Sequence, residues 1–213
     1  MKHKQIDVKQ YPDLPEYPKE VHDYFYIDRI LGNVPNKQNA LIDLNKWNTE
    51  LNKDISDPDK PGKTKSWKQV NLIFVNVGEN KPQEYGFALQ DKWEGGNKND
   101  FVVSFSMNND GKLNWVYPFS WSESEELKLD VIDYMMNQKQ IKDFIPVVDQ
   151  VSKKVADKFV RKQFADFSYL QIDISNVATV FIWVFNIGIL VGYVAYLRSE
   201  EDYKRRCNKR FRS

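Results

Sequence analysis

The sequence predicts an α/β fold, a mixed β-sheet covered by helices in a sandwich, followed by a single C-terminal transmembrane helix. Three observations predict it. The apolar, largely β-branched or aromatic runs at 70–77 and 101–107 are typical of buried strands. Amphipathic helical repeats separate and follow these runs, so helices and strands alternate along the chain. Residues 177–197 then form an apolar run without any charged side chain.

The first third of the chain supplies an arm, a short apolar segment and a first helix. Residues 1–20 carry three prolines spaced three residues apart, which favour an extended arm along the domain surface over a helix. Residues 21–35 predict a strand or a short turn. Residues 36–54 repeat apolar side chains near the 3.6-residue period and predict a helix. The Pro, Gly and Asp content of residues 56–66 predicts a loop.

The middle of the chain predicts a helix and a hairpin around the second long strand. A helical pattern with an apolar face ends at Trp93, and the glycine-containing stretch 94–100 predicts a loop. The Asp-Gly pair within 108–111 predicts a tight turn that joins the strand at 101–107 to a paired strand at 113–120. Pro118 cannot donate to a ladder, so it indicates an edge strand.

Two helices are expected to close the domain. Ser122 or Ser124 caps the first of them, and Ser122 has the capping-box spacing to a glutamate three residues later. This helix is expected to run to about Gln138. A further helix is predicted over 139–167, and Pro146 either kinks it or marks its true first turn.

Residues 177–197 predict a membrane span. A helix of this length reaches about 30 Å, the thickness of the hydrocarbon core of a bilayer. The alternative is a buried core helix, but such helices are usually shorter and carry a polar face. The sequence therefore divides into an arm (1–20), an α/β domain (21–170), a transmembrane helix (177–197) and a basic tail (198–213). Membrane lipid is the first partner that this organisation implies.

The tail is the basic part of a nearly neutral chain. The whole chain has a formal net charge of +1, so no overall field favours nucleic acid, and none is expected as a partner. Six basic side chains of the tail are expected to face anionic lipid: Lys204, Arg205, Arg206, Lys209, Arg210 and Arg212. The single cysteine, Cys207, also lies in the tail, so the large domain cannot contain a disulfide or a thiolate metal site.

The charge pattern and the N-terminus give conflicting indications of membrane orientation. The basic tail is expected to be cytoplasmic, which places the large domain outside. The first 21 residues lack the apolar run of a signal peptide. A reverse signal-anchor, a cleaved leader missing from this sequence, or a tail-anchored protein with a cytoplasmic domain would each resolve the conflict. We expect the extracytoplasmic domain.

Three residues of the predicted span can mediate helix packing. Gly188 and Gly192 form a GxxxG pair, the spacing that lets two helices approach closely and that predicts a homodimer. Asn186 lies on nearly the opposite face of the helix. Its amide is expected to hydrogen-bond to a helix of another membrane protein.

The order of features between residues 21 and 167 resembles the TPM domain, the fold of a group of thylakoid proteins, of membrane-anchored bacterial proteins and of a nematode receptor-accessory protein. The matching stretches are VHDYFYIDRIL, VNLIFVNV, YGFALQDKWEGGNKNDFVVSFSM, DGKLNWVY and KDFIPVVDQVSKKVADKF. Phe101 departs from the family pattern, in which a small apolar residue follows the loop aspartate. The resemblance implies a membrane-anchored accessory or binding protein that acts in the assembly, maintenance or regulation of membrane protein complexes.

The resemblance also implies a cation site and an alternative function. Some family members bind a divalent cation, and acid phosphatase activity is known in the family. The positions that match its acidic motifs are Asp23 and Asp100, with Asn99 beside the latter, and they imply a site for Ca²⁺ or another divalent cation. Carboxylate and amide oxygens are suitable ligands for such an ion. Alternatively, Asn99 and Asp100 only terminate a loop and Asp23 only caps a turn.

The sequence gives little support for other kinds of catalytic or nucleotide-binding site. The chain has two histidines, His3 and His22, and no glycine-rich phosphate loop, so we predict no catalytic residues. Three functions stay open: the accessory protein, a divalent-metal-dependent phosphatase-like hydrolase, and a structural or viral membrane protein. Four tryptophans fall near loops or hairpin ends, at positions 67, 93, 115 and 121. We expect at least two of these tryptophans to be buried and one or two to anchor a partner.

Overall fold

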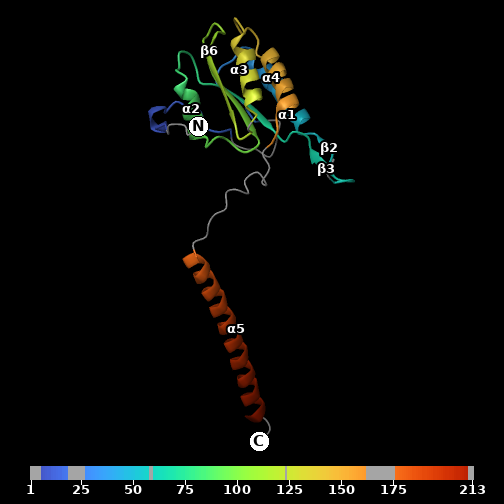
Figure 1. The fold of residues 1–213 in the computed structure, drawn as a ribbon, viewed down its shortest axis with the longest axis vertical. Coiled ribbons are helices and arrows are strands. Elements are labelled where there is room, and N and C mark those ends of the chain that lie inside the picture. Colours follow the sequence, from blue (N-terminus) through green and yellow to red (C-terminus); the bar gives the residue numbers. More distant parts are fainter. Residues whose placement is uncertain (1–5, 19–26, 58–59, 123, 162–175, 211–213) are drawn as a thin grey trace. The chain divides into compact units, whose positions relative to one another are not determined.

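A computed structural model of the chain describes residues 6–18, 27–57, 60–122, 124–161 and 176–210 (Figure 1). The chain divides into two compact units, residues 1–163 and residues 164–213. We call the first unit the head. The described part of the second unit is one long helix, α5 (Asn176–Arg210). The predicted arm (1–20) and the predicted domain (21–170) up to residue 163 therefore belong to the first unit.

The head is built on a four-stranded mixed sheet with the order β1-β4-β5-β6. The strands are β1 (Ile30–Leu31), β4 (Asn71–Asn76), β5 (Asp100–Met107) and β6 (Leu113–Ser120). The first three are parallel, and β6 pairs antiparallel with β5. The two predicted apolar strands are thus the central pair. The predicted edge position of Pro118 is confirmed, because β6 is the outer strand.

Helices cover both faces of this sheet (Figure 1). On one face lie α1 (Lys37–Leu51), α3 (Glu125–Met136) and α4 (Ile145–Lys158), whose apolar residues share one core cluster with the sheet. On the other face lies α2 (Glu84–Lys92), with the 3-10 turn η1 (Val8–Gln10) against it. The predicted mixed α/β class with a helix-covered sheet is confirmed.

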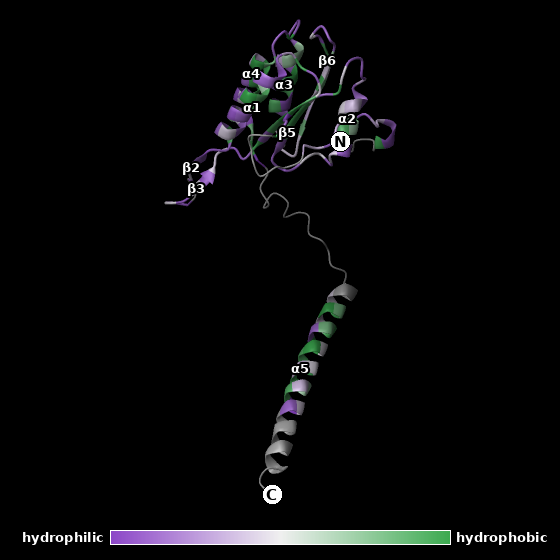
Figure 2. Ribbon diagram, turned by 180° about the vertical axis from the view of Figure 1, so that it is seen from behind, coloured by the Kyte–Doolittle hydropathy of each residue, from purple (hydrophilic) through white to green (hydrophobic). Residues whose placement is uncertain are grey.

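Aromatic side chains fill the core under the three helices. The ring of Phe144 meets Phe74 edge to face at 5.3 Å and stacks on Phe105 at 5.6 Å. All three side chains are fully buried. Such pairs add about 0.5–1.5 kcal/mol to the stabilisation that comes from burial itself. The start of α4 is thereby fixed over the middle of the sheet. Figure 2 shows hydrophobic residues along the strands of the sheet and along parts of the helices that cover it.

The N-terminal arm lies along the head, as predicted, and packs beside α2. Leu14 is buried in the second core cluster together with Leu89 of α2. The indole nitrogen Nε1 of Trp93 donates to the carbonyl of Pro15 at 3.1 Å, and the Tyr17 ring meets the Trp93 ring at 5.2 Å. The arm contains the 3-10 turn η1, which the proline spacing did not predict.

The structure corrects the loop predicted over 56–66. Short strands β2 (Asp54–Ser56) and β3 (Thr64–Ser66) pair antiparallel as a separate hairpin. Backbone hydrogen bonds extend the pairing at both ends, from Trp67 N to Lys53 O at 2.9 Å and from Asp57 N to Lys63 O at 2.8 Å. These bonds depend on the backbone alone. The composition of the segment therefore could not indicate them.

The observed starts of α3 and α4 contradict the predicted capping box and distinguish between the two alternatives for Pro146. Helix α3 begins at Glu125 with Ser124 as N-cap and no side-chain capping bond, so the capping box at Ser122 is wrong. Helix α4 begins at Ile145, and Pro146 lies in its first turn, which is the second of the two alternatives. It ends at Lys158, earlier than predicted, because Phe159 turns to an extended conformation and is buried.

Helix α5 contains one stretch long and apolar enough to cross a membrane, Thr179–Glu200. None of this stretch is buried against the rest of the protein. Figure 2 shows hydrophobic residues along the surface of α5. This finding agrees with a single-pass membrane protein. By length and composition alone the core helix of a soluble protein passes the same test, so that alternative stays open.

Candidate functional site

A polar groove of about 970 Å³ opens where β4 and β5 begin. Its walls come from α1, from the segments that lead into β4 and β5, and from the arm at Tyr17 and Pro18. Amide side chains dominate it. Six asparagines line the groove: Asn45, Asn48, Asn52, Asn71, Asn97 and Asn99. We call this site the amide groove.

A buried row of polar groups crosses the amide groove. Arg29, before β1, is 5% exposed, and its Nε donates to Oδ1 of Asn71 at 2.7 Å. Nδ2 of Asn71 in turn donates to Oδ1 of Asp100 at 3.0 Å, and Asp100 is 1% exposed. The asparagine thus joins a buried cation to a buried anion. Such charges need hydrogen-bonded partners, because burial without them costs several kcal/mol.

The second carboxylate oxygen of Asp100 is held by the arm and by the loop before β5. Oδ2 accepts from the hydroxyl of Tyr17 and from the backbone N–H of Asn97, both at 2.8 Å. Gly96 makes this approach possible, since its φ is +77° and a Cβ there would lie 3.1 Å from Oδ2. Asp100 therefore fastens three segments that are far apart in the sequence.

Asn48 of α1 and Asn52, which directly follows α1, bond to the backbone at the start of β4 and just before it. Asn48 accepts from Leu72 N at 2.8 Å and donates to Leu72 O at 3.2 Å, and Asn52 donates to Val70 O at 2.6 Å. The sequence analysis missed these residues. Asn45, Asn48 and Asn52 are three and four residues apart, which places them along one face of a helix. That spacing was the available signal.

The predicted cation ligands are only partly within the described residues. Asp23 lies outside them. Asp100 is surrounded by the three donors described above, whereas Oδ1 of Asn99 is buried without a hydrogen-bond partner. The described residues contain no cluster of three acidic, histidine or cysteine side chains that could hold a metal. Because Ca²⁺ takes 6–8 oxygen ligands, the described residues alone do not complete such a site.

The predicted packing residues of the span lie on α5. Nδ2 of Asn186 donates to the carbonyl of Ile182 at 2.7 Å, so its amide group is partly satisfied within its own helix. A Cβ at Gly188 or Gly192 would meet no atom of this chain within 4 Å, so both positions are open on the helix surface. The homodimer and the second membrane protein stay predictions.

The six basic side chains of the tail have no described environment. Arg212 lies outside the described residues. Lys204, Arg205, Arg206, Lys209 and Arg210 lie on the backbone of α5, but the description does not extend to their side chains. Lipid contact by the tail therefore also stays a prediction.

Two of the four tryptophans near loops are buried, as predicted, and contact of the others with a partner stays a prediction. Trp93 and Trp115 are buried, and their indole nitrogens donate to the carbonyls of Pro15 and Lys81. Trp121, which follows β6, is 42% exposed. Of the four tryptophans near loops, this one is best placed to contact a partner.

Comparison with known proteins gives no family assignment. No protein-family model, no curated protein and no solved structure matches the chain. The resemblance to the TPM domain therefore stays a prediction.

Proposed function

We propose that the chain is a TPM-like accessory protein, held in a membrane as a single-pass protein by α5, that binds other membrane proteins during their assembly, maintenance or regulation. The observation that carries the proposal is the amide groove on a head that is followed by an apolar helix. The large domain is extracytoplasmic and the basic tail is cytoplasmic in this proposal.

The chemistry of the groove suits a polar, uncharged segment of a partner. Amide side chains both donate and accept, so they can pair with the N–H and C=O groups of an exposed peptide backbone. The charges in the wall compensate one another, because Arg29 and Lys53 are matched by Asp54 and Asp100. A neutral groove gives a strongly charged ligand no electrostatic advantage.

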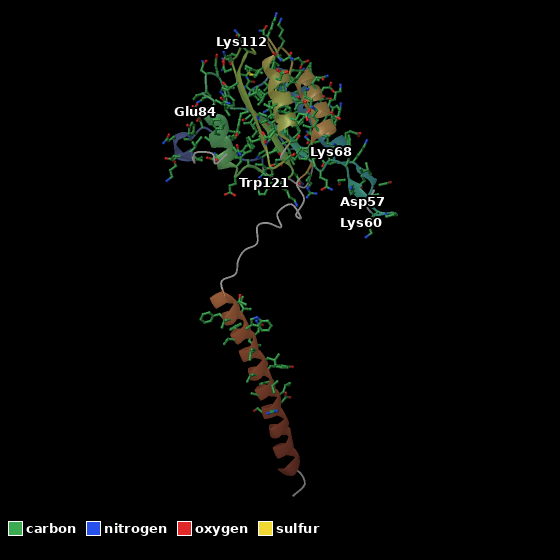
Figure 3. All side chains as sticks on the ribbon, viewed as in Figure 1. Asp57, Lys60, Lys68, Glu84, Lys112 and Trp121 are labelled. Atoms are coloured by element: carbon green, nitrogen blue, oxygen red, sulfur yellow. The ribbon has the colours of Figure 1, made fainter. Side chains whose placement is uncertain are left out.

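Site-specific crosslinking in membranes tests this proposal. A photo-crosslinking amino acid is placed at Thr49, an exposed lining residue of the groove, and in a control protein at Lys112, which lies at the opposite end of β6 from Trp121 and does not line the groove (Figure 3). We expect a crosslinked membrane protein from Thr49 alone. The same products from both positions, or none from Thr49, would contradict the accessory role and favour a structural membrane protein.

Protease protection of the full-length chain in intact membranes tests the orientation. The basic tail supports a cytoplasmic C-terminus. We expect protease added to the extracytoplasmic side to digest the head and leave α5 protected. A head that is cut only from the cytoplasmic side would identify a tail-anchored protein instead.

A second candidate function is a divalent-metal-dependent phosphatase-like hydrolase. The unpartnered Oδ1 of Asn99 favours it, since a buried carbonyl oxygen without a donor is a suitable cation ligand. Asn99→Asp would add a carboxylate at this point, with Asn97→Asp as the matched control in the same loop. We expect Ca²⁺ or Mn²⁺ to raise the unfolding temperature of Asn99→Asp more than that of the control. If neither the natural chain nor Asn99→Asp responds to a cation, this candidate fails.

A further inference from the structure

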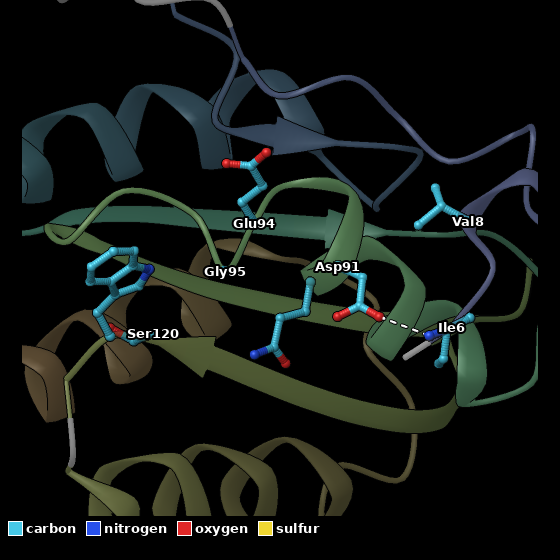
Figure 4. Close-up of a pocket in the computed structure, with 8 residues that line it drawn as sticks. Ile6, Val8, Asp91, Glu94, Gly95 and Ser120 are labelled. Carbon is cyan, nitrogen blue, oxygen red and sulfur yellow. Dashed lines mark hydrogen bonds between the residues drawn. The ribbon is translucent and has the colours of Figure 1, made fainter. Parts of the chain in front are cut away.

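A second hollow lies at the C-terminal end of α2 and shares no lining residue with the amide groove. Its volume is about 480 Å³. The walls come from the start of the arm (Ile6 and Val8), from the last turn of α2 and the loop after it, and from the end of β6 at Trp121 (Figure 4). We call it the indole hollow.

The loop after α2 is shaped to meet the indole of Trp121. Glu94 has φ +52° and Gly95 has φ +79°, so two successive residues are left-handed. The N–H of Gly95 donates back to Gln90 O at 2.7 Å. A Cβ at Gly95 would lie 3.1 Å from Nε1 of Trp121, so glycine suits both the backbone conformation and the close approach. Glu94, which is not glycine, adopts this conformation at a cost.

The electrostatic character of the indole hollow is negative. The C-terminal end of a helix carries a partial negative charge from its free carbonyls. Asp91, in the last turn of α2, and Glu94, just beyond it, add two carboxylates at this end, where acidic side chains disfavour the helix itself. A cation bound in the hollow would offset this unfavourable interaction with the helix dipole.

The described cations nearby do not neutralise these carboxylates. Oδ2 of Asp91 accepts from the neutral backbone N–H of Ile6 at 3.1 Å (Figure 4). Lys92, the basic residue in the last turn of α2, is directed instead to Glu16 at 2.7 Å and to Leu14 O at 2.9 Å. Among the described residues none forms a hydrogen bond or ion pair with the carboxylate of Glu94, which is exposed.

An aromatic wall and a large volume favour an organic cation over a metal ion. The partly exposed Trp121 offers an indole, the ring that binds ammonium and guanidinium groups best. An indole is no metal ligand. The volume far exceeds the roughly 30 Å³ that one water molecule occupies, so an organic group fits it.

We propose that the indole hollow binds the ammonium or guanidinium group of a lysine or arginine side chain on a partner protein. Carboxylates bind such groups through N–H donors, whereas a quaternary ammonium of a lipid headgroup has none to give. Arginine is also enriched at protein interfaces. The proposal uses a site distinct from the amide groove, and it stands even if that groove binds nothing.

The test is a titration of the full-length chain in detergent micelles with ¹⁵N-labelled tryptophan. The indole N–H resonance of Trp121 is assigned with Trp121→Phe. The probes are the Nα-acetyl methylamides of lysine and arginine, with that of glutamine as the neutral control. We expect saturable shifts of the Trp121 resonance with the two cations only, while the resonances of the buried Trp93 and Trp115 stay in place. Equal shifts with the glutamine derivative would overturn the proposal.

Variants of α2 and its loop supply the matched comparison. Glu94→Gln removes one carboxylate of the hollow, and Glu84→Gln removes one at the other end of the same helix (Figure 3). We expect Glu94→Gln to bind the cations about fivefold more weakly, as for the loss of one exposed charge pair, and Glu84→Gln to bind them as the natural chain does. Unchanged affinity in Glu94→Gln would overturn the proposal.

Two further measurements distinguish a basic side chain of a partner protein from two other possible occupants, a lipid headgroup and a lysine of the same chain. Choline binding as tight as that of the lysine derivative would assign the hollow to a lipid headgroup and overturn the proposal. Residues 1–5 include Lys2 and Lys4. If the cationic probes bind only after these five residues are removed, Lys2 or Lys4 of the same chain occupies the hollow. This result would also contradict the proposal that a partner protein supplies the cation. Equal binding with and without them supports the proposal.

Discussion

The same types of apolar residue are buried in the head and exposed on the surface of helix α5. Phe105 of the head is fully buried, whereas Phe181 and Phe185 of α5 are 71% and 69% exposed. In the head, the helices bury one apolar stripe, and the central strands β4 and β5 are buried along almost their whole length. In Thr179–Glu200 apolar side chains face outward on all sides. The head thus buries its apolar side chains within itself, whereas the apolar surface of α5 agrees with a bilayer environment.

Polar side chains show the same contrast. Asn48 of the head is buried and bonds to the backbone of a neighbouring strand, whereas Asn186 bonds to a carbonyl of its own helix. In the head a polar group is part of the tertiary structure. In α5 it is compatible with an isolated helix. The four predictions below test this contrast, in order of decreasing expected effect.

Removal of α5 is expected to have the largest effect. A chain that stops after residue 175 should leave the membrane fraction completely, because it lacks the candidate span and only a few large apolar side chains are exposed on the described part of the head. A chain that stops after residue 200 keeps the candidate span and serves as the control. Flotation of membranes on a density gradient measures the distribution. A shortened chain that still floats with the membranes would show that the head binds lipid by itself.

Truncation of a core phenylalanine should destabilise the head strongly. Phe144→Ala removes a ring that contacts Phe74 and Phe105, and we expect a loss of about 3–5 kcal/mol in the free energy of unfolding. The control is Phe181→Ala on α5, which should leave the unfolding of the head unchanged. Denaturant unfolding of both variants in detergent, followed by near-UV circular dichroism, measures this. A similar loss in both would contradict the independence of the two units.

Replacement of the buried amide should have an intermediate effect. Asn48→Leu leaves the N–H and C=O of Leu72 without their side-chain partner, at an expected cost of about 1–3 kcal/mol. Asn186→Leu is the matched change in α5 and should not alter the stability of the head. The same unfolding measurement compares them. Unchanged stability in Asn48→Leu would mean that water replaces the amide in the groove.

The surface ion pairs of the head should give the smallest effect, and one that depends on pH. The hydrogen bond from Lys158 lowers the pKa of Asp130 below its ordinary 3.8, and the hydrogen bonds to Asp130 and then Glu126 raise the pKa of Lys158 above its ordinary 10.5. The stabilisation is therefore present between these two ordinary values. It is lost as the pH falls through the lowered pKa of Asp130 or rises through the raised pKa of Lys158.

Lys158→Met tests this pair. We expect a slightly lower unfolding temperature than that of the natural chain at pH 7, and a smaller difference at pH 2.5. Lys142→Met, at an exposed position outside the described ion pairs, is the control. A difference that stays constant over this range would assign the effect to packing of the lysine stem instead of to charge.

Local patterns predicted most of the secondary structure but not the amide groove. Apolar runs identified β4 and β5, and the Asp-Gly turn identified the hairpin to β6, since each signal lies within a few residues of its effect. Pro146 indicated the start of α4 only as one of two alternatives. The row from Arg29 through Asn71 to Asp100 joins residues about 70 positions apart, brought together only by the parallel pairing of β1, β4 and β5. The resemblance to the TPM domain indicated Asp100 and Asn99 as cation ligands, which stays a prediction, but not Tyr17, Asn71 and Asn97, which donate to Asp100.

The N-terminal arm has a consequence for both sites. Its first described residue, Ile6, donates to Asp91 in the indole hollow, and Tyr17 donates to Asp100 in the amide groove. The arm from Ile6 to Tyr17 thus contributes a wall residue to each of the two cavities. Proteolysis within this arm, or a fusion that displaces it, would remove a wall from both cavities at the same time. The shapes of the indole hollow and the amide groove therefore both depend on an intact N-terminal arm.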